Sequence, residues 1–281
     1  MEENAHLPQI TRLDRRCRKH GENTSMDEQV QAEIQIANDL TALGVKPGGV
    51  LLVHASLRSL GNVAGGAETV VRGLLRALQE NGTLLMPALT YRYTTVNTPV
   101  FDYQNTPSCV GALPEYFRTR ANTTRSIHPT HSVSGVGALA KRILENHYLD
   151  ITPCGVHSPF YRLREVSGQI LFLGCGLRPN TSMHAVEEIV EPPYLFGHPV
   201  DYRIILSTGK EMTMRVKRHH FAGWKQRYDR LAPLLDEDGL KQGKVLDATC
   251  DLVSCEQMWE RALTALKRDP FFFVEKQNKS P

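Results

Sequence analysis

Residues 50–78 read VLLVHASLRSLGNVAGGAETVVRGLLRAL, and this stretch decides the fold. Its first five residues are almost all apolar and follow a PGG turn, which is typical of a short strand buried on both faces. The small residues after them show no periodicity and predict a loop. A helix is then expected over 67–79, because Val71, Leu74, Leu75 and Leu78 fall on one face.

The same alternation continues along the chain. TLLMPA at 83–88 and QILFLG at 169–174 predict further buried strands, and DYRIILSTGKEMTMRV at 201–216 predicts a hairpin with STGK as its turn. Helices are expected at 28–43, 110–120, 133–146, 225–235 and 255–267, the last with a capping box at 254–257. Short buried strands between amphipathic helices indicate an α/β fold, with a mixed central sheet flanked by helices.

The chain shows no repeat and no linker, so we expect a single domain over 26–275. Residues 1–25 are polar and basic and predict a weakly ordered leader, and residues 276–281 a short tail. The irregular segment 89–109 is longer than a simple connection, and such loops in compact domains are often functional.

Composition excludes some classes of function. A formal charge of +3 over 281 residues is too small to indicate a nucleic-acid partner, and the chain lacks a run of about 18 apolar residues that would span a membrane. The first residues contain no apolar segment typical of an export signal, so we expect a cytoplasmic protein with free thiols. Cys154, in TPCGVHSP, is a candidate nucleophile, although a lone cysteine in a loop is more often structural.

The loop ASLRSLG after the first strand is a candidate phosphate site. Backbone N–H groups in such a loop are donors in a positive local field, and Arg58 could add a bidentate contact. The alternative is an ordinary strand-to-helix turn in which Ser and Gly only supply turn geometry. The loop is neither a P-loop nor a GxGxxG motif, which disfavours nucleoside triphosphates and dinucleotides.

Two histidines, His128 and His131, stand three residues apart in SIHPTHSVSGVG at 126–137. A metal site would need a third ligand at a recognisable spacing, and the sequence indicates none, so we expect no metal. A metal-dependent hydrolase stays open as an alternative on these histidines.

The segment LFLGCGLRPNTSMHAVEEIVE at 171–191 is the most informative for catalysis. A buried strand leads through a glycine turn to a helix that begins near Thr181 or Ser182. His184 would lie in the first turn, with Glu187 on the same face, and a carboxylate beside an imidazole orients a general base. The alternative is a surface His–Glu pair.

These motifs resemble the aminoglycoside 3-N-acetyltransferase family. The shared segments are VHASLRSLG, GGAET, GTLLMPALT, HPTHSV, HSPF, LGCG and TSMHAVEE, in the family's order across roughly residues 28–200. The resemblance implies the antibiotic acetyltransferase fold, which is distinct from the GNAT fold. It also implies acetyl-CoA as co-substrate and an amino-sugar amine, the 3-amino group of 2-deoxystreptamine, as acceptor.

The resemblance assigns roles to residues. It places His184 and Glu187 at the reacting amine, and His54 is expected as a second polar contact near the thioester. Residues expected at the CoA pyrophosphate and pantetheine are Ser56, Leu57, Arg58, Ser59 and Gly61, with Ser132 and Val133 bordering the pantetheine. Acids expected to attract a polycationic acceptor are Asp102, Glu188 and Glu191, together with Glu115.

The implied mechanism is direct transfer in a ternary complex, with His184 as general base and backbone N–H groups at the oxyanion. The segment VFDYQNTPSCVGALPEYFR at 100–118 differs from the resistance enzymes, so acetylation of another amino sugar, as in surface polysaccharide or secondary metabolism, is the alternative. A catalytically idle acyl-CoA-binding protein is the alternative from another class. A homodimer is left open.

Overall fold

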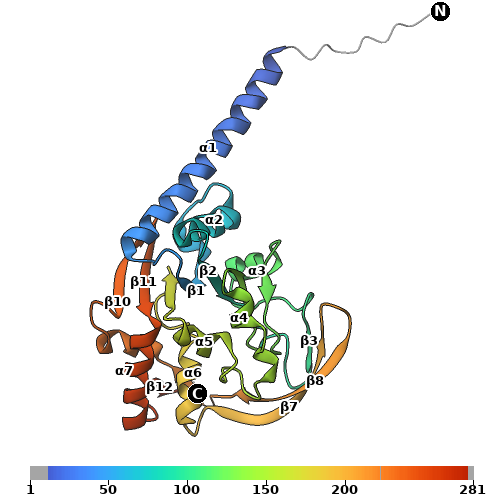
Figure 1. Cartoon of the computed structure of the whole chain (residues 1–281), viewed down its shortest axis with the longest axis vertical. Coiled ribbons are helices and arrows are strands. Elements are labelled where there is room, and N and C mark those ends of the chain that lie inside the picture. Colours follow the sequence, from blue (N-terminus) through green and yellow to red (C-terminus); the bar gives the residue numbers. More distant parts are fainter. Residues whose placement is uncertain (1–11, 222, 278–281) are drawn as a thin grey trace, which may run out of the picture.

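The computed structural model describes the backbone of residues 12–221 and 223–277 and the side chains from Ser25 onward. Its centre is a seven-stranded sheet in the order β10-β11-β6-β1-β2-β5-β4 (Figure 1). The strands are β1 (Val50–Ala55), β2 (Thr83–Pro87), β4 (Thr124–Arg125), β5 (Val133–Gly137), β6 (Gln169–Leu173), β10 (Leu240–Val245) and β11 (Ala248–Ser254). Strands β6, β1 and β2 are parallel and the other pairs are antiparallel, which confirms the expected mixed α/β sheet.

Helices cover both faces of this sheet because its strands are apolar on both sides. Leu51 and Val53 of β1 face the layer of α1 (Arg12–Leu43), α2 (Gly66–Leu78) and α3 (Ala112–Thr119). Leu52 faces the opposite layer, where Phe160 of α5 (Pro159–Glu165) and Trp259 of α7 (Cys255–Arg268) are buried with α4 (Ala140–Leu144) and α6 (Met183–Val190). The buried strands predicted at 50–54, 83–88 and 169–174 are therefore confirmed.

Helix α1 is longer than predicted. Its backbone is helical from Arg12, so residues 12–25, expected as a weakly ordered leader, are its first turns, and residues 1–11 lie outside the described part of the chain. The sequence from 12 to 43 contains no proline, and its Arg, Lys, Gln and Glu residues are good helix formers. Figure 1 shows the N-terminal half of α1 projecting away from the rest of the molecule.

The helix predicted over 133–146 is only partly correct. Residues Val133–Gly137 form strand β5, which pairs antiparallel with β2, and the helix is limited to Ala140–Leu144. A Cβ atom on Gly135 would overlap the side chain of Leu85, so the small residues of this segment let it approach the neighbouring strand.

Two smaller sheets are built mostly from the C-terminal third. Strands β3 (Val100–Asp102), β7 (Phe196–Ile205) and β8 (Glu211–His219) form one, and the predicted hairpin is confirmed as β7–β8. Strands β9 (Trp224–Gln226) and β12 (Val274–Lys276) form the other. The helix predicted at 225–235 is the 3₁₀ helix η3 (Tyr228–Leu234), and Ser254 caps α7 as its spacing predicted. Two shorter 3₁₀ helices are η1 (Leu57–Leu60) and η2 (His147–Leu149).

None of the described helices is both long enough and apolar enough to cross a membrane.

Candidate active site

A cavity of about 300 Å³ lies where the start of α6, the end of β8 and the start of η3 meet. We call it the histidine cavity, because His131, His184 and His219 are part of its wall. His184 is in the first turn of α6, the helix that the sequence predicted at this point. The hairpin brings in His219 from a distant part of the sequence, and the loop before β5 brings in His131.

His184 and Glu187 form a buried pair. Nδ1 of His184 lies 2.9 Å from Oε2 of Glu187, whose side chain is fully buried, while the side chain of His184 is 10% exposed. A surface ion pair, the alternative from the spacing alone, would expose both side chains. Burial instead restricts the pair to one geometry beside the cavity.

Two tyrosines fix the orientation of this pair. The hydroxyl of Tyr228 donates to Oε2 of Glu187 at 2.7 Å and lies 2.8 Å from Nδ1 of His184, and Tyr194 donates to Oε1 at 3.1 Å. Burial raises the pKa of Tyr228, so its hydroxyl keeps its proton. A carboxylate can only accept, so the imidazole must carry its proton on Nδ1. The lone pair of His184 is therefore on Nε2, the nitrogen left for the cavity.

The other two histidines are also anchored through one nitrogen. Nε2 of His219 lies 2.7 Å from Oε1 of Glu188, and Nδ1 of His131 lies 2.9 Å from the hydroxyl of Thr130. Burial lowers the pKa of both imidazoles, and nearby histidines lower it further, so both rings are neutral. Burial also raises the pKa of Glu188 to about 7.

His54 lines a second cavity of about 120 Å³, which we call the His54 cavity, at the carboxyl end of β1. Thr181 and Pro179 line both cavities, so the two hollows are neighbours. The His54 ring stacks on Phe172 with centroids 5.1 Å apart, and burial lowers its pKa to about 3. His54 is therefore a neutral polar group in a hollow next to the histidine cavity.

The SLRSLG loop lies at a switch point of the sheet. The chain passes from β1 to β2 on one side, while β6 pairs with β1 on the other. Ligands of open α/β sheets bind at the carboxyl ends of strands at such a point. The hydroxyl of Ser59 donates to the carbonyls of Ser56 (2.6 Å) and Gly174 (3.2 Å), which joins the loop to the end of β6. Arg58 is exposed, and its side chain is outside both cavities.

Gly174 shows why this contact needs a glycine. Its φ is +70°, and a Cβ atom would overlap the Ser59 hydroxyl. Gly61 has φ +79°, and a Cβ atom there would overlap the carboxylate of Asp247. The loop conformation is therefore set by two glycines as well as by its serines.

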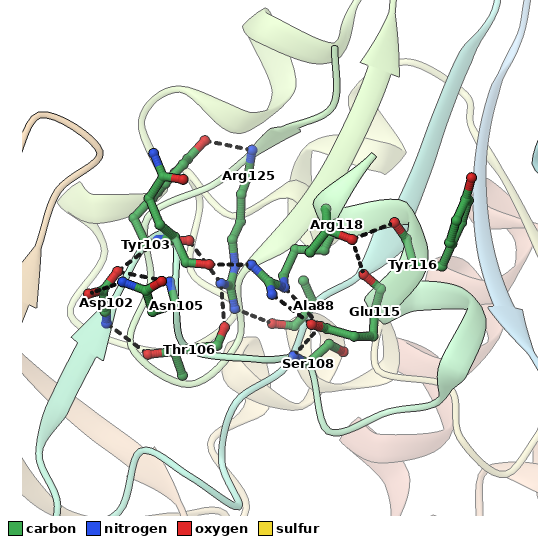
Figure 2. Close-up of polar contacts among 12 residues, drawn as sticks. Ala88, Asp102, Tyr103, Asn105, Thr106, Ser108, Glu115, Tyr116, Arg118 and Arg125 are labelled. Carbon is green, nitrogen blue, oxygen red and sulfur yellow. Dashed lines mark hydrogen bonds and ion pairs between the residues drawn. The ribbon is translucent and has the colours of Figure 1, made fainter. Parts of the chain in front are cut away.

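Ser132 and Val133 lie away from both cavities. Val133 belongs to the core beneath the sheet, and the hydroxyl of Ser132 donates to the carbonyl of Ala88 at 2.7 Å. Ser132 also accepts from Arg125 at 2.9 Å, and the buried Arg125 guanidinium donates to carbonyls of the 89–109 loop (Figure 2). Burial lowers the pKa of Arg125 to about 9. These residues hold the long loop, whose first part, at Tyr91, borders the histidine cavity.

The expected acids are dispersed. Asp102 accepts from the backbone of Gln104 and Asn105 in a turn, and Glu115 accepts from Arg118 and from the backbone of Ser108; both belong to the network around Arg125 (Figure 2). Glu191 ends α6 with a positive φ. Glu188 alone is near the histidine cavity, and it is buried behind His219. The structure therefore does not bring these acids together in an acceptor cleft.

The position of Cys154 does not suit a nucleophile. Its side chain is fully buried, burial raises the pKa of its thiol, and its backbone N–H donates to Glu188 at 2.8 Å.

The sequence did not indicate three contributors to the site: Tyr194, Tyr228 and His219. Each comes from the last third of the chain, where the sequence predicts only a hairpin and two helices. The segment KRHH at 217–220, directly after the predicted hairpin, was the one available signal, since two histidines there follow an apolar-alternating strand.

Known proteins similar to this chain identify its family. A model of the family described as aminoglycoside 3-N-acetyltransferase matches residues 52–267. Aminoglycoside N(3)-acetyltransferase IV of Salmonella is 32% identical over 243 residues, which are 85% of this chain and 89% of the relative. The chain is therefore an acyltransferase. It belongs to the aminoglycoside 3-N-acetyltransferase family, which confirms the resemblance seen in the sequence.

Solved structures show the same fold. A mutant of the aminoglycoside acetyltransferase AAC(3)-IVa in complex with gentamicin has a TM-score of 0.73 and 31% identity, covering 85% of this chain and 89% of that one. The acetyltransferase AAC-IIIb in a binary complex with CoASH has a TM-score of 0.72 and 25% identity, covering 88% of this chain and 97% of that one.

Proposed function

We propose that this protein transfers the acetyl group of acetyl-CoA to the 3-amino group of an aminoglycoside, with His184 as general base. The observation that carries the proposal is the buried His184–Glu187 pair, at 2.9 Å, whose imidazole keeps a bare Nε2 beside a cavity. The family and the relatives named for this activity support the acceptor, and the CoASH complex of a relative supports the donor.

The donor would enter along the carboxyl ends of the parallel strands. We place the CoA pyrophosphate at the loop of Ser56, Leu57, Arg58, Ser59 and Gly61, at the switch point between β1 and β6. The pantetheine would then pass through the His54 cavity, whose shared wall at Thr181 leads to His184. His54 would act as a neutral contact near the thioester.

The chemistry is a direct transfer. The amine nitrogen attacks the thioester carbonyl while Nε2 of His184 accepts a proton from the amine. The C–S bond then breaks, and the CoA thiolate is released. Glu187 stabilises the imidazolium, and it keeps Nδ1 protonated so that Nε2 is the base. Backbone N–H groups at the start of α6 are the oxyanion donors that we propose.

The charge of the cavity favours a second candidate acceptor. Among the described residues that line the histidine cavity none is acidic, and Arg178 and Arg218 place two guanidinium groups there. The adjoining hollow of about 610 Å³ along the β7–β8 hairpin also has no acid among its described lining residues. An amino sugar that carries a carboxylate or phosphate fits these charges better than a polycation does.

The test is thiol release from acetyl-CoA with a panel of acceptors, followed by mass spectrometry of the products. We expect turnover of at least one 2-deoxystreptamine aminoglycoside, with one added acetyl group on the 3-amino nitrogen. Turnover of anionic amino sugars alone would select the second candidate. Absence of thiol release with every amine, from a protein that binds acetyl-CoA, would instead support the idle acyl-CoA-binding protein.

A further inference from the structure

The three histidines of the histidine cavity have the arrangement of a metal-binding site. Each of His131, His184 and His219 offers one ligand nitrogen, and these nitrogens all lie within 4.8 Å of one another. The sequence indicated only His128 and His131, and no third ligand. His128 is not part of this cluster, and its Nδ1 accepts from the backbone of Thr130 and His131. Two ligands from distant segments, His184 and His219, complete the set instead.

Each ring is fixed by its other nitrogen, as metal-ligating histidines are. Glu187 holds Nδ1 of His184 at 2.9 Å, Glu188 holds Nε2 of His219 at 2.7 Å, and the Thr130 hydroxyl lies 2.9 Å from Nδ1 of His131. Two of the three partners are carboxylates, which increase the basicity of the ligand and orient the ring.

The remaining ring nitrogens have no competing partner among the residues that the structure describes. Nδ1 of His219 is buried and unpartnered among the described residues, and the side chain is only 5% exposed. Burying a polar nitrogen without a hydrogen bond is costly, so an unpartnered nitrogen in a polar cavity indicates a ligand. The hydrogen bonds that the described residues form with His131 and His184 likewise use Nδ1 and leave Nε2.

We propose that His131, His184 and His219 bind one divalent transition-metal ion, of the zinc type, with the fourth position open to the cavity. Neutral imidazoles are the preferred nitrogen ligands of zinc, and three of them with one open position form a common open zinc site. Zn–N bonds of about 2.0–2.1 Å in a tetrahedral site need nitrogens roughly 3.4 Å apart, so small rotations of the rings would complete the site. The buried carboxylate of Glu187 beside His184 offsets part of the repulsion from Arg178 and Arg218.

Metal binding has a consequence for catalysis, and this consequence rests on the proposed role of His184. The Nε2 lone pair that binds a metal ion cannot accept a proton from the amine. The metal-bound enzyme should therefore be inhibited, and a chelator should restore the rate.

The test titrates Zn²⁺ into chelator-treated protein by calorimetry, with no donor or acceptor present. We expect one ion per chain, and X-ray absorption should show three imidazole nitrogens at about 2.0–2.1 Å. His219→Ala and His131→Ala should each weaken binding at least about 100-fold, because loss of a ligand exceeds the effect of losing an outer partner. His198→Ala is the control, since His198 is an exposed histidine outside the cluster.

Circular dichroism and thermal unfolding of each variant separate lost ligation from lost folding. Unchanged Zn²⁺ affinity in both folded variants, or absorption data without three imidazoles, would overturn the proposal. Because binding is measured without turnover, it can succeed where acetyl transfer fails. If Zn²⁺ binds through the three histidines and the transfer rate does not fall, the metal site stands and His184 is not the base.

Discussion

His147 and the histidines of the histidine cavity differ in what their ring nitrogens do. His147 is fully buried, with Nδ1 3.0 Å from the Ser126 hydroxyl and Nε2 3.0 Å from the carbonyl of Pro153, so both nitrogens serve the structure. His184 uses only Nδ1, toward Glu187 and Tyr228, and keeps Nε2 for the cavity. Burial alone therefore does not distinguish the two. Both ring nitrogens of His147 have hydrogen-bond partners, whereas His184 has Nδ1 anchored and Nε2 unused by the described residues.

The largest expected effect is at His184. His184→Ala should lower the turnover number about 10²–10⁴-fold, the usual contribution of a positioned base, with little change in acetyl-CoA affinity. The control is His157→Ala, because His157 also pairs with a carboxylate at 2.9 Å, that of Asp150, but lies outside the histidine cavity. Thiol release and calorimetry measure the two quantities. A loss below threefold, or an equal loss in His157→Ala, would make the His184 pair structural.

Glu187→Gln is expected to lower turnover roughly 10–100-fold, the range found for partners that orient a histidine. The amide NH₂ can donate to Nδ1, which would place the imidazole proton on Nε2 and remove the base. Steady-state kinetics should show the loss in the turnover number and not in the Michaelis constant for acetyl-CoA. A rate equal to the wild type would show that the charge of Glu187 has no role in transfer.

Tyr228→Phe removes one hydrogen bond from Glu187 and one contact with His184. A loss of about 1 kcal/mol is expected, which is roughly a fivefold lower turnover number, since Glu187 keeps its bond from Tyr194. Tyr93→Phe, an exposed tyrosine outside the cavity, is the matched control. If Tyr228→Phe matched the loss in Glu187→Gln, the hydroxyl and not the carboxylate would be orienting His184.

For the buried histidines we expect a pH dependence of the free energy of unfolding rather than of the transfer rate. Burial lowers the pKa of His147 to about 3, below its ordinary value of 6.5, so the unfolded chain binds the proton more readily. Its contribution to stability is complete above pH 6.5 and is lost as the pH falls from 6.5 toward about 3, by about 1.4 kcal/mol per pH unit.

His147→Gln should reduce the slope of the unfolding free energy against pH between pH 4 and 6. The expected reduction is roughly 1.4 kcal/mol per pH unit, the value for the uptake of one proton. Denaturant unfolding at several pH values measures this slope. His198→Gln is the control, because His198 is exposed and should leave the slope as in the wild type. An equal slope in His147→Gln and wild type would show that His147 does not couple protonation to folding.

The sequence determined much of the fold. The apolar runs at 50–54, 83–88 and 169–174 are buried strands because their side chains alternate between two helical layers, and Ser254 capped α7 at the predicted place. The helix predicted at 133–146 was mostly wrong in its first part, since valine and glycine there pair with β2. Periodicity could not reveal this pairing, because a strand partner is set by distant residues.

The His184–Glu187 pair was also determined by the sequence, because the two residues share one helix and their three-residue spacing fixes their contact. Only the tertiary structure decided the rest of the site. His219 and Tyr228 reach His184 through packing between segments distant in the chain, and the acids expected at the acceptor are held in turns and networks elsewhere. A local spacing fixes neighbours on one element, whereas contacts between elements depend on how all the layers pack.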